Sequence, residues 1–299
     1  MSTIEYRNIK WIDIVRPKSE DLRFLESNGF HHLLVSEVET PTYHPLVEYY
    51  KTYLFWILHF PAWDQKREQI NSIEIDFLVT NDMLITIRYQ EFQDFENLWK
   101  SVQEQRGQYL DKTTGHLFYH VVKTLLNKTF PELDRIKEAL DQIETLILED
   151  LDETIIEKII YTDHHILSFL RALKPQKTVW DSAPQYVQMF WGDRLKPYFS
   201  DLIADYRRTL HVAETHKETI NSLHLSSNSL LDNKRNHVVK ILTIFTAIIL
   251  PLSLFASVYG MNLTHLPLAS RADAFWWFLG GMAAITAGML VYFRIKKWL

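Results

Sequence analysis

The chain has 299 residues, of which 47% are hydrophobic and 23% charged, with no cysteine and a net charge of −5. This composition excludes a disordered or collagen-like chain, disulfides, iron–sulfur clusters, thiolate zinc sites and cysteine nucleophiles. Residues 234–299 carry seven basic and one acidic side chain, or +6, whereas the preceding 233 residues carry 25 basic and 36 acidic side chains, or −11. The acidic front part argues against nucleic acid as a partner and suits cations.

Residues 1–110 are predicted to form a cytoplasmic α/β domain. The apolar runs 53–60, 72–79 and 83–89 are typical of strands, and Asn81 and Asp82 supply a turn between the last two. The first residues are mixed and polar, so we expect no cleaved signal peptide.

Two helical segments are predicted to follow. Residues 111–196 form a helical region, because 131–174 is a pattern rich in Leu, Ile, Glu and Lys that no Pro or Gly interrupts inside, which predicts a long helix or a helical hairpin. Between Pro197 and Pro251 no Pro or Gly occurs, and one helix of this length would extend about 80 Å. Its part before the membrane, 197–237, is predicted to belong to this continuous helix. The alternative is a helix that breaks at 226–229, where helix propensity is low.

The C-terminal residues are predicted to cross a membrane twice. Residues 238–259 and 274–293 are long and apolar enough to span a hydrocarbon core of about 30 Å. They are joined by an outer loop, 260–273, and followed by a basic tail, 294–299. Because basic residues flank the pair of spans, both termini are expected in the cytoplasm, which indicates a multi-pass protein of the cell membrane in contact with lipid.

The first span carries a polar stripe. Seven residues with an average spacing of 3.5 share one helix face: Asn236, Val239, Leu242, Thr246, Leu250, Ser253 and Ser257. Polar side chains that face lipid are costly, and two helices cannot enclose a water-filled path. The stripe therefore predicts a homo-oligomer whose first spans surround a pore, although Ser and Thr can also bond back to their own helix.

A short motif closes the first span. Tyr259-Gly260-Met261-Asn262 in this position, with Lys296-Lys297-Trp298-Leu299 ending the chain, resembles the CorA-type magnesium transporter family of divalent cation transporters. The resemblance continues backwards at the family's spacing through Asn236-x-x-x-Lys240-x-Leu242-Thr243. It implies an α/β cytoplasmic domain, a long helical stalk and two C-terminal transmembrane helices, assembled as a homopentamer.

The resemblance also implies roles for residues. Gly260, Met261 and Asn262 would form a selectivity filter, and the seven stripe residues would line a pore for hydrated magnesium, with cobalt and nickel as further ions. Neutral amide oxygens can hydrogen-bond the water shell of an ion that dehydrates reluctantly. Asn262 is also compatible with a helix C-cap. No loop carboxylate precedes Asp273, so capture of cations at the mouth is expected to be weak.

Magnesium is expected in a second, regulatory role. By similarity, Glu37 and Asp201 of neighbouring subunits would bind intracellular magnesium and hold the pore shut. The expectation includes no organic cofactor and no enzymatic activity, because no P-loop, nucleophile elbow or pair of catalytic carboxylates occurs. Two alternatives stay open: a zinc transporter of the same superfamily, and a membrane-anchored metal sensor or scaffold without conduction.

Overall fold

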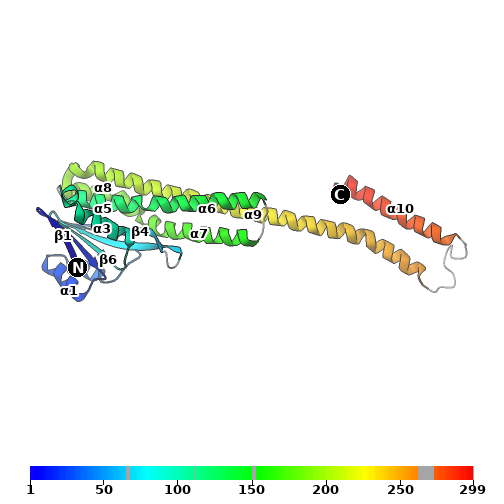
Figure 1. Ribbon diagram of the computed structural model, residues 1–299, viewed down its shortest axis with the longest axis horizontal. Coiled ribbons are helices and arrows are strands. Elements are labelled where there is room, and N and C mark those ends of the chain that lie inside the picture. Colours follow the sequence, from blue (N-terminus) through cyan, green and yellow to red (C-terminus); the bar gives the residue numbers. More distant parts are fainter. Residues whose placement is uncertain (65–67, 111, 150–152, 262–272, 299) are drawn as a thin grey trace. The chain divides into compact units, whose positions relative to one another are not determined.

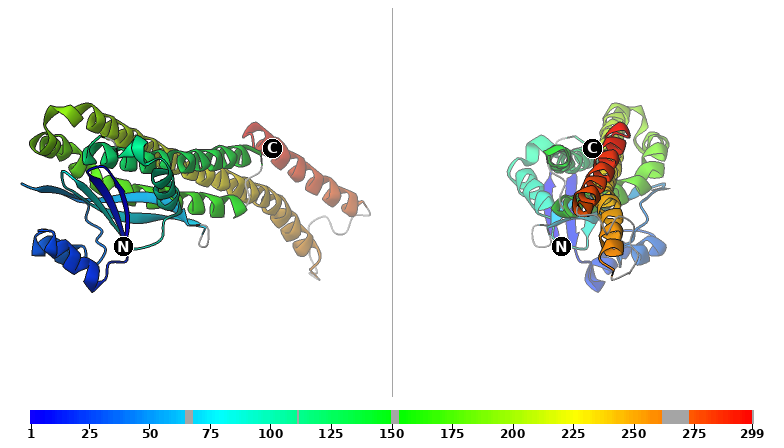
Figure 2. Two further views of the ribbon diagram at one scale, coloured as in Figure 1. Left: turned by 60° about the vertical axis from the view of Figure 1, so that its left-hand side comes forward. Right: turned by 90° about the vertical axis from the view of Figure 1, so that its right-hand side faces the viewer.

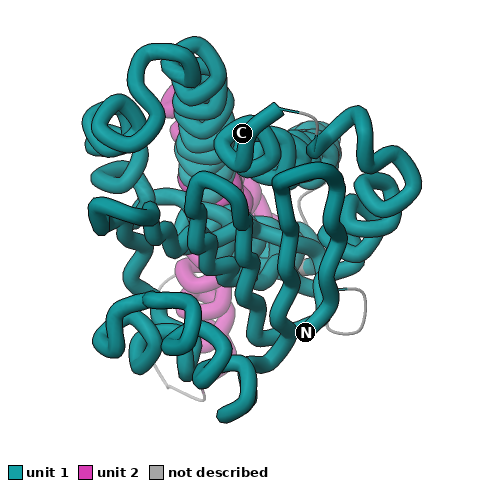
Figure 3. Tube along the Cα trace, turned by 90° about the vertical axis from the view of Figure 1, so that its left-hand side faces the viewer, with its two compact units in different colours: residues 1–224 teal, residues 225–299 magenta. Residues whose placement is uncertain are grey.

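The computed structural model describes residues 1–64, 68–110, 112–149, 153–261 and 273–298. The chain divides into two compact units, Met1–His224 and Leu225–Leu299 (Figure 3).

The first unit contains a six-stranded sheet. Its order is β1-β2-β6-β5-β4-β3, and among the described strands only β2 and β6 run parallel to each other. The predicted strands are confirmed as β4, β5 and β6. The bounds of the six strands are β1 Ser2–Tyr6, β2 Ile9–Val15, β3 Leu46–Tyr50, β4 Tyr53–Asp64, β5 Gln69–Val79 and β6 Met83–Arg88.

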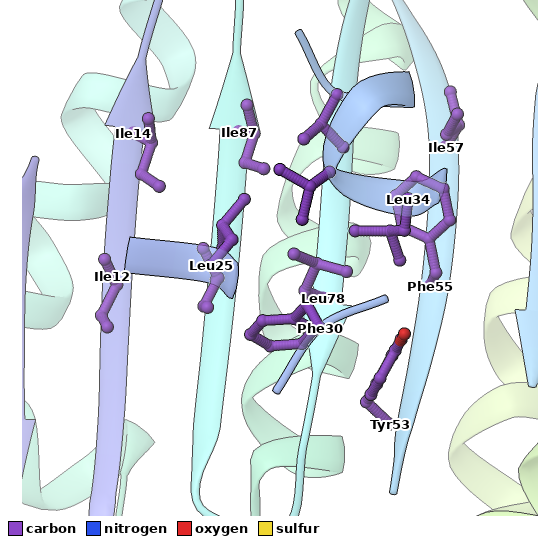
Figure 4. Packing of buried hydrophobic residues seen from close by; sticks show 13 residues of the cluster. Ile12, Ile14, Leu25, Phe30, Leu34, Tyr53, Phe55, Ile57, Leu78 and Ile87 are labelled. Carbon is purple, nitrogen blue, oxygen red and sulfur yellow. The ribbon is translucent and has the colours of Figure 1, made fainter. Parts of the chain in front are cut away.

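Strand β4 is apolar without alternation because both of its faces are covered. Phe55 and Ile57 point to one face, where they pack with residues of α1 (Ser19–Ser27) and α2 (His32–Glu37) (Figure 4). Trp56, between them, points to the other face and lies 5.2 Å from the ring of Phe118. A strand buried on both sides reads as a continuous apolar run, which explains the sequence of 53–60.

Helices cover the second face of the sheet (Figures 1 and 2). An aromatic cluster of Trp56, Phe118, Trp180 and Phe199 joins the sheet to three of them, and each of its side chains is at most 1% exposed. The helices between the sheet and the long helix are α3 Gln93–Glu104, α4 Arg106–Tyr109, α5 Thr114–Asn127, α6 Thr129–Glu149, α7 Glu153–Leu173, η1 Lys174–Gln176, α8 Lys177–Trp191 and η2 Gly192–Leu195.

The uninterrupted pattern at 131–174 forms a helical hairpin and not one helix. Helices α6 and α7 lie side by side in both views (Figures 1 and 2). They bury regularly spaced apolar residues, such as Leu133, Ile136 and Leu140 on α6 and Ile159 and Ile166 on α7.

Helix α9 (Lys196–Tyr259) is the longest element of the chain, at 64 residues. It is continuous through 226–229, so low helix propensity there does not break it. In the first unit its buried positions alternate by three and four residues, the spacing that presents one face of a helix to a neighbour. These positions are Phe199, Leu202, Tyr206, Thr209, Ala213, His216, Ile220 and Leu223.

The second unit consists of the rest of α9 and of α10 (Ala274–Ile295). Pro251 lies inside α9, where it removes one backbone N–H from the helical hydrogen bonds.

A buried ion pair connects β2 and β6 in the first unit. Arg88 Nη2 lies 2.8 Å from Asp13 Oδ2, and the two side chains are 2% and 5% exposed. Thr86 donates to Asp13 Oδ1 at 2.8 Å, and Glu96 accepts from Arg88 at 2.7 Å. The Arg88 guanidinium also lies 4.4 Å from the ring centroid of Phe95.

We predict that Asp13→Asn lowers the free energy of unfolding by about 3–5 kcal/mol, because it leaves a buried guanidinium without its main counterion. Denaturant unfolding followed by circular dichroism measures the change. The matched control is Lys10→Gln, which breaks the exposed Lys10–Glu5 pair at 3.4 Å and should cost less than about 1 kcal/mol. Equal losses for both variants would contradict a special role of the buried pair.

Candidate functional site

Among the described residues, two helical stretches are apolar and long enough to cross a membrane, judged by length and composition. The most apolar window within the helical run ending at Tyr259 has a mean hydropathy of 2.3, and that of Phe275–Ile295 has 1.5. Only 6% of each window is buried inside the chain. The core helix of a soluble protein would be mostly buried, so these helices have the character of spans and not of a protein core.

Helix α10 covers one face of the apolar part of α9. On α9, Ile244 is 8% exposed, and the ring of Tyr259 lies 4.8 Å from that of Phe278 on α10. At the other end, Lys240 Nζ donates to the backbone carbonyl of Lys297 at 3.1 Å. Other α9 residues of this face are half-buried: Ala247, Ile248, Pro251 and Leu252.

The predicted polar stripe lies on the opposite face of α9. At about 100° per residue, its centre is roughly half a turn from Ile244, with Asn236 at its edge. Leu242 and Leu250 are both 62% exposed, although they are large and apolar. All seven stripe residues are exposed in the single chain: Asn236, Val239, Leu242, Thr246, Leu250, Ser253 and Ser257.

The polar members of the stripe differ in their hydrogen bonds. The Thr246 hydroxyl donates to the Leu242 carbonyl at 2.8 Å, so it bonds back to its own helix. In the part of the chain that the structure describes, the side chains of Asn236, Ser253 and Ser257 make no hydrogen bond. Water can satisfy these groups and hydrocarbon cannot, so the face requires a wet environment or polar neighbours.

The motif after the first span is only partly described. Helix α9 ends at Tyr259, and the Gly260 N–H donates to the Ala256 carbonyl at 2.9 Å. A Cβ at Gly260 would lie 3.1 Å from that carbonyl oxygen, so close approach and not a positive φ favours glycine here. Met261 is 52% exposed. Asn262 and the loop through 272 lie outside the described residues.

Asp201, the predicted regulatory carboxylate on α9, contacts α5. Lys123 Nζ lies 2.7 Å from Asp201 Oδ2 and 2.5 Å from Asp205 Oδ2. The Tyr119 hydroxyl also donates to Asp201 Oδ2, at 2.8 Å. Hydrogen bonds from Lys123 and then Tyr119 lower the pKa of Asp201. Sequence reasoning missed Lys123 and Tyr119, because nothing in the sequence relates residues about 80 positions apart.

Glu37, the predicted partner carboxylate, ends α2 near other acids. Partial burial is the largest cause of its raised pKa, followed by the negative charges of Glu48 and Glu74. A raised carboxyl pKa marks a place where a cation would relieve electrostatic repulsion. Among the described residues of one chain, no contact joins Glu37 to Asp201, and no group of three or more His, Asp or Glu is arranged to hold a metal.

A buried acidic network lies beside Glu37 on the sheet, and sequence reasoning missed it too. Asp76 on β5 is fully buried and accepts from the Tyr89 hydroxyl at 2.7 Å. Glu74, two residues earlier on the same face, accepts from the Thr42 N–H at 2.7 and 3.0 Å. His59 Nε2 lies 3.4 Å from Glu74 Oε2. Burial and then the charge of Glu74 raise the pKa of Asp76 well above its ordinary value.

The sequence matches one protein family over almost its whole length. Residues 6–297 match the family described as "CorA-like Mg2+ transporter protein". The cobalt/magnesium transport protein CorA of Thermotoga maritima is 26% identical over 294 residues, which cover 97% of this chain and 83% of that protein. The protein of the same name from Methanocaldococcus jannaschii is 25% identical over 301 residues, which cover 99% and 92%.

The fold matches as well. The complete structure of the CorA magnesium transporter from M. jannaschii superposes with a TM-score of 0.84 at 22% sequence identity. The match covers 100% of this chain and 95% of that one. The α/β N-terminal domain, the long helix and the two C-terminal apolar helices are therefore the fold of that structure, as predicted.

We predict that Asp76→Asn removes a pH-dependent cost to stability. Because the pKa of Asp76 is higher in the folded protein than in the unfolded chain, its contribution to folding is complete at acid pH and is lost as pH rises. The stability of Asp76→Asn relative to the unmodified protein should therefore increase as the pH rises above about 4, the ordinary pKa range of an aspartate.

Thermal unfolding at several pH values measures this difference. Glu39→Gln, at an exposed carboxylate outside the network, is the matched control. A constant difference between Asp76→Asn and the unmodified protein would contradict the raised pKa.

Proposed function

Because the chain belongs to the CorA-like Mg2+ transporter family, we propose that it conducts divalent cations through a pore that several copies of α9 surround. The observation that carries this proposal is the polar stripe of α9. Its exposed amide and hydroxyl groups lie on the face that α10 leaves open, within a helix apolar enough to cross a membrane. If several copies of the chain are arranged around a common axis, their α9 helices enclose a water-filled path that these polar groups can face. Helix α10 of each copy then lies on the outside, in contact with lipid.

The transported ion we propose is magnesium with its water shell, and cobalt and nickel as further ions. Two relatives carry cobalt and magnesium in their names, which supports both ions. Neutral oxygens of Asn236, Ser253 and Ser257 suit a hydrated ion, because they hydrogen-bond its waters without holding the charge tightly. Val239, Leu242 and Leu250 provide apolar rings that can close a pore by excluding water.

The outer end of the proposed pore is the filter Gly260, Met261 and Asn262. In this proposal, a ring of Asn262 amides selects the ion before it enters between the α9 helices. The number of copies is five, as in the family that the sequence resembles. The protein is a multi-pass protein of the cell membrane with both termini in the cytoplasm, supported by the basic residues that flank the two spans.

Regulation by intracellular magnesium is a further part of the proposal. Glu37 of one subunit and Asp201 of its neighbour would share the ion. The chemistry of both residues fits, since carboxylate oxygens are the ligands that magnesium prefers, and Glu37 lies among negative charges. Asp201 fits in part: Oδ2 is bound by Lys123 and Tyr119, whereas Oδ1 has no hydrogen bond among the described residues.

We predict that Asn262→Ala reduces magnesium uptake into proteoliposomes at least about tenfold and leaves the oligomer intact, because the mouth loses its amide ring. Flux of magnesium, cobalt, nickel and zinc measured side by side gives the ion order. Asn228→Ala, at an exposed position of α9 before the apolar span, is the matched control and should transport normally.

Full magnesium flux in Asn262→Ala would refute the proposed role of Asn262 in the selectivity filter. Flux of zinc alone would favour the zinc transporter, and no flux of any ion would favour a non-conducting sensor.

The pore face itself can be tested by cysteine substitution, since the chain has no native cysteine. We predict that Thr246→Cys, Ser253→Cys and Ser257→Cys react with a membrane-impermeant cationic thiol reagent and that the reaction blocks flux. Phe245→Cys is the control: Phe245 is 63% exposed in the single chain but lies off the stripe, so in the assembled protein it faces lipid or a neighbour. Equal reactivity at 245 and 246 would place the water path elsewhere.

A further inference from the structure

We propose that the Lys123 ammonium is a built-in cation for the Asp201–Asp205 pair, and that a divalent ion binds Asp201 only in competition with it. This inference rests on the proposed regulatory role of Asp201 and assigns the residue that sets its affinity for metal.

The contact is a ladder between two helices of the first unit. Tyr119 and Lys123 lie one turn apart on α5, and Asp201 and Asp205 lie one turn apart on α9. One ammonium therefore serves two carboxylates, at 2.7 and 2.5 Å, and the tyrosine hydroxyl occupies the same Asp201 oxygen. The group of four side chains keeps a net charge of −1.

The two helices are held together independently of this ladder. Phe118, next to Tyr119, stacks on Phe199 of α9 with ring centroids 5.6 Å apart and planes 11° from parallel. A Cβ at Gly115 on α5 would overlap the side chain of Leu195, just before α9, so the backbones approach closely there. The ammonium and the carboxylates are thus kept together by packing, and removing the lysine charge leaves the helices in contact.

The ion pair changes what Asp201 can bind. Its side chain is 44% exposed, so an ion can reach it from solvent. Lys123 and Tyr119, whose hydrogen bonds lower the pKa of Asp201, also compete with a metal ion for this carboxylate. The two donors and the metal ion are attracted by the same negative charge. A dication on Oδ1 would lie within a few ångströms of the ammonium on Oδ2 and be repelled by it.

Burial lowers the pKa of Lys123, but its contacts with Asp201 and Asp205 raise the pKa by more, so that it ends above its ordinary value. The ammonium therefore remains charged at neutral pH. The repulsion is therefore present under cellular conditions. It raises the concentration of divalent ion that is needed to occupy Asp201.

The test measures Mn²⁺ binding to the full-length protein in nanodiscs by the electron paramagnetic resonance signal of free Mn²⁺. Lys123→Gln should bind Mn²⁺ about fivefold more tightly than the unmodified protein, the factor expected when a partly exposed ion pair is removed. Adding Asp201→Asn to Lys123→Gln should abolish the gain, which assigns it to this pair through a double-mutant cycle. Lys123→Arg keeps the charge and should bind like the unmodified protein.

Lys217→Gln is the matched control. Lys217 pairs with Asp163 at 2.6 Å with side-chain exposures of 27% and 26%, close to the 25% of Lys123. It should leave Mn²⁺ binding unchanged. If Lys123→Gln does not fold, Lys123→Met, which also removes the charge, replaces it in the same cycle.

The inference is overturned if Lys123→Gln binds Mn²⁺ like the unmodified protein, or if the gain survives Asp201→Asn. Because this measurement needs no transport, its outcome is separate from that of the proposed function. If no ion flux is found but Lys123→Gln binds Mn²⁺ about fivefold more tightly, the proposed transport is rejected and the competition at Asp201 is retained. If flux is normal but Lys123→Gln shows no gain in binding, transport is retained and the competition is rejected.

Discussion

The chemistry of the second unit depends on one constraint, which is that hydrocarbon cannot satisfy a polar side chain. Helix α9 has one face covered by α10 and an opposite face with exposed Ser253, Ser257 and Asn236. A chain that crosses a membrane alone would leave these groups unsatisfied. The cost disappears if other copies bring water or polar neighbours to that face, which is the physical reason for the oligomer that we propose.

The same helix meets two solvents with two different surfaces. In the first unit, α9 buries positions spaced by three and four residues, from Phe199 to Leu223. In the second unit, most of its large apolar side chains are exposed in the single chain, as expected of a helix that meets lipid or further copies instead of a protein core. The overall hydrophobic fraction of the chain does not reveal this change of surface along α9. The distribution of charged residues along the helix does, because they become rare where the apolar part begins.

Local and periodic features could be predicted from the sequence. The run 53–60 gives a strand because both faces of β4 are buried, and the stripe of α9 follows from helical spacing alone. The choice between one helix and a hairpin at 131–174 could not be made, since both present the same pattern.

The contacts of the proposed regulatory carboxylates could not be predicted either. Lys123 and Asp201 are separated by 78 residues, and their pairing depends on how α5 packs on the sheet. The burial of Asp76 was equally inaccessible, because an Ile-Glu-Ile-Asp alternation is also what a strand with one solvated face would show.

The bond from Lys240 to the carbonyl of Lys297 has a consequence for how the hairpin responds to its bilayer. It joins the start of the apolar part of α9 to the end of α10. In the proposed membrane arrangement, both helices would share one anchoring plane on the side of the basic residues. In that arrangement, a thinner or thicker membrane would act on both helices together, and a common tilt would accommodate the change in thickness. Lipid thickness would in this way reach the polar face of α9 without touching it.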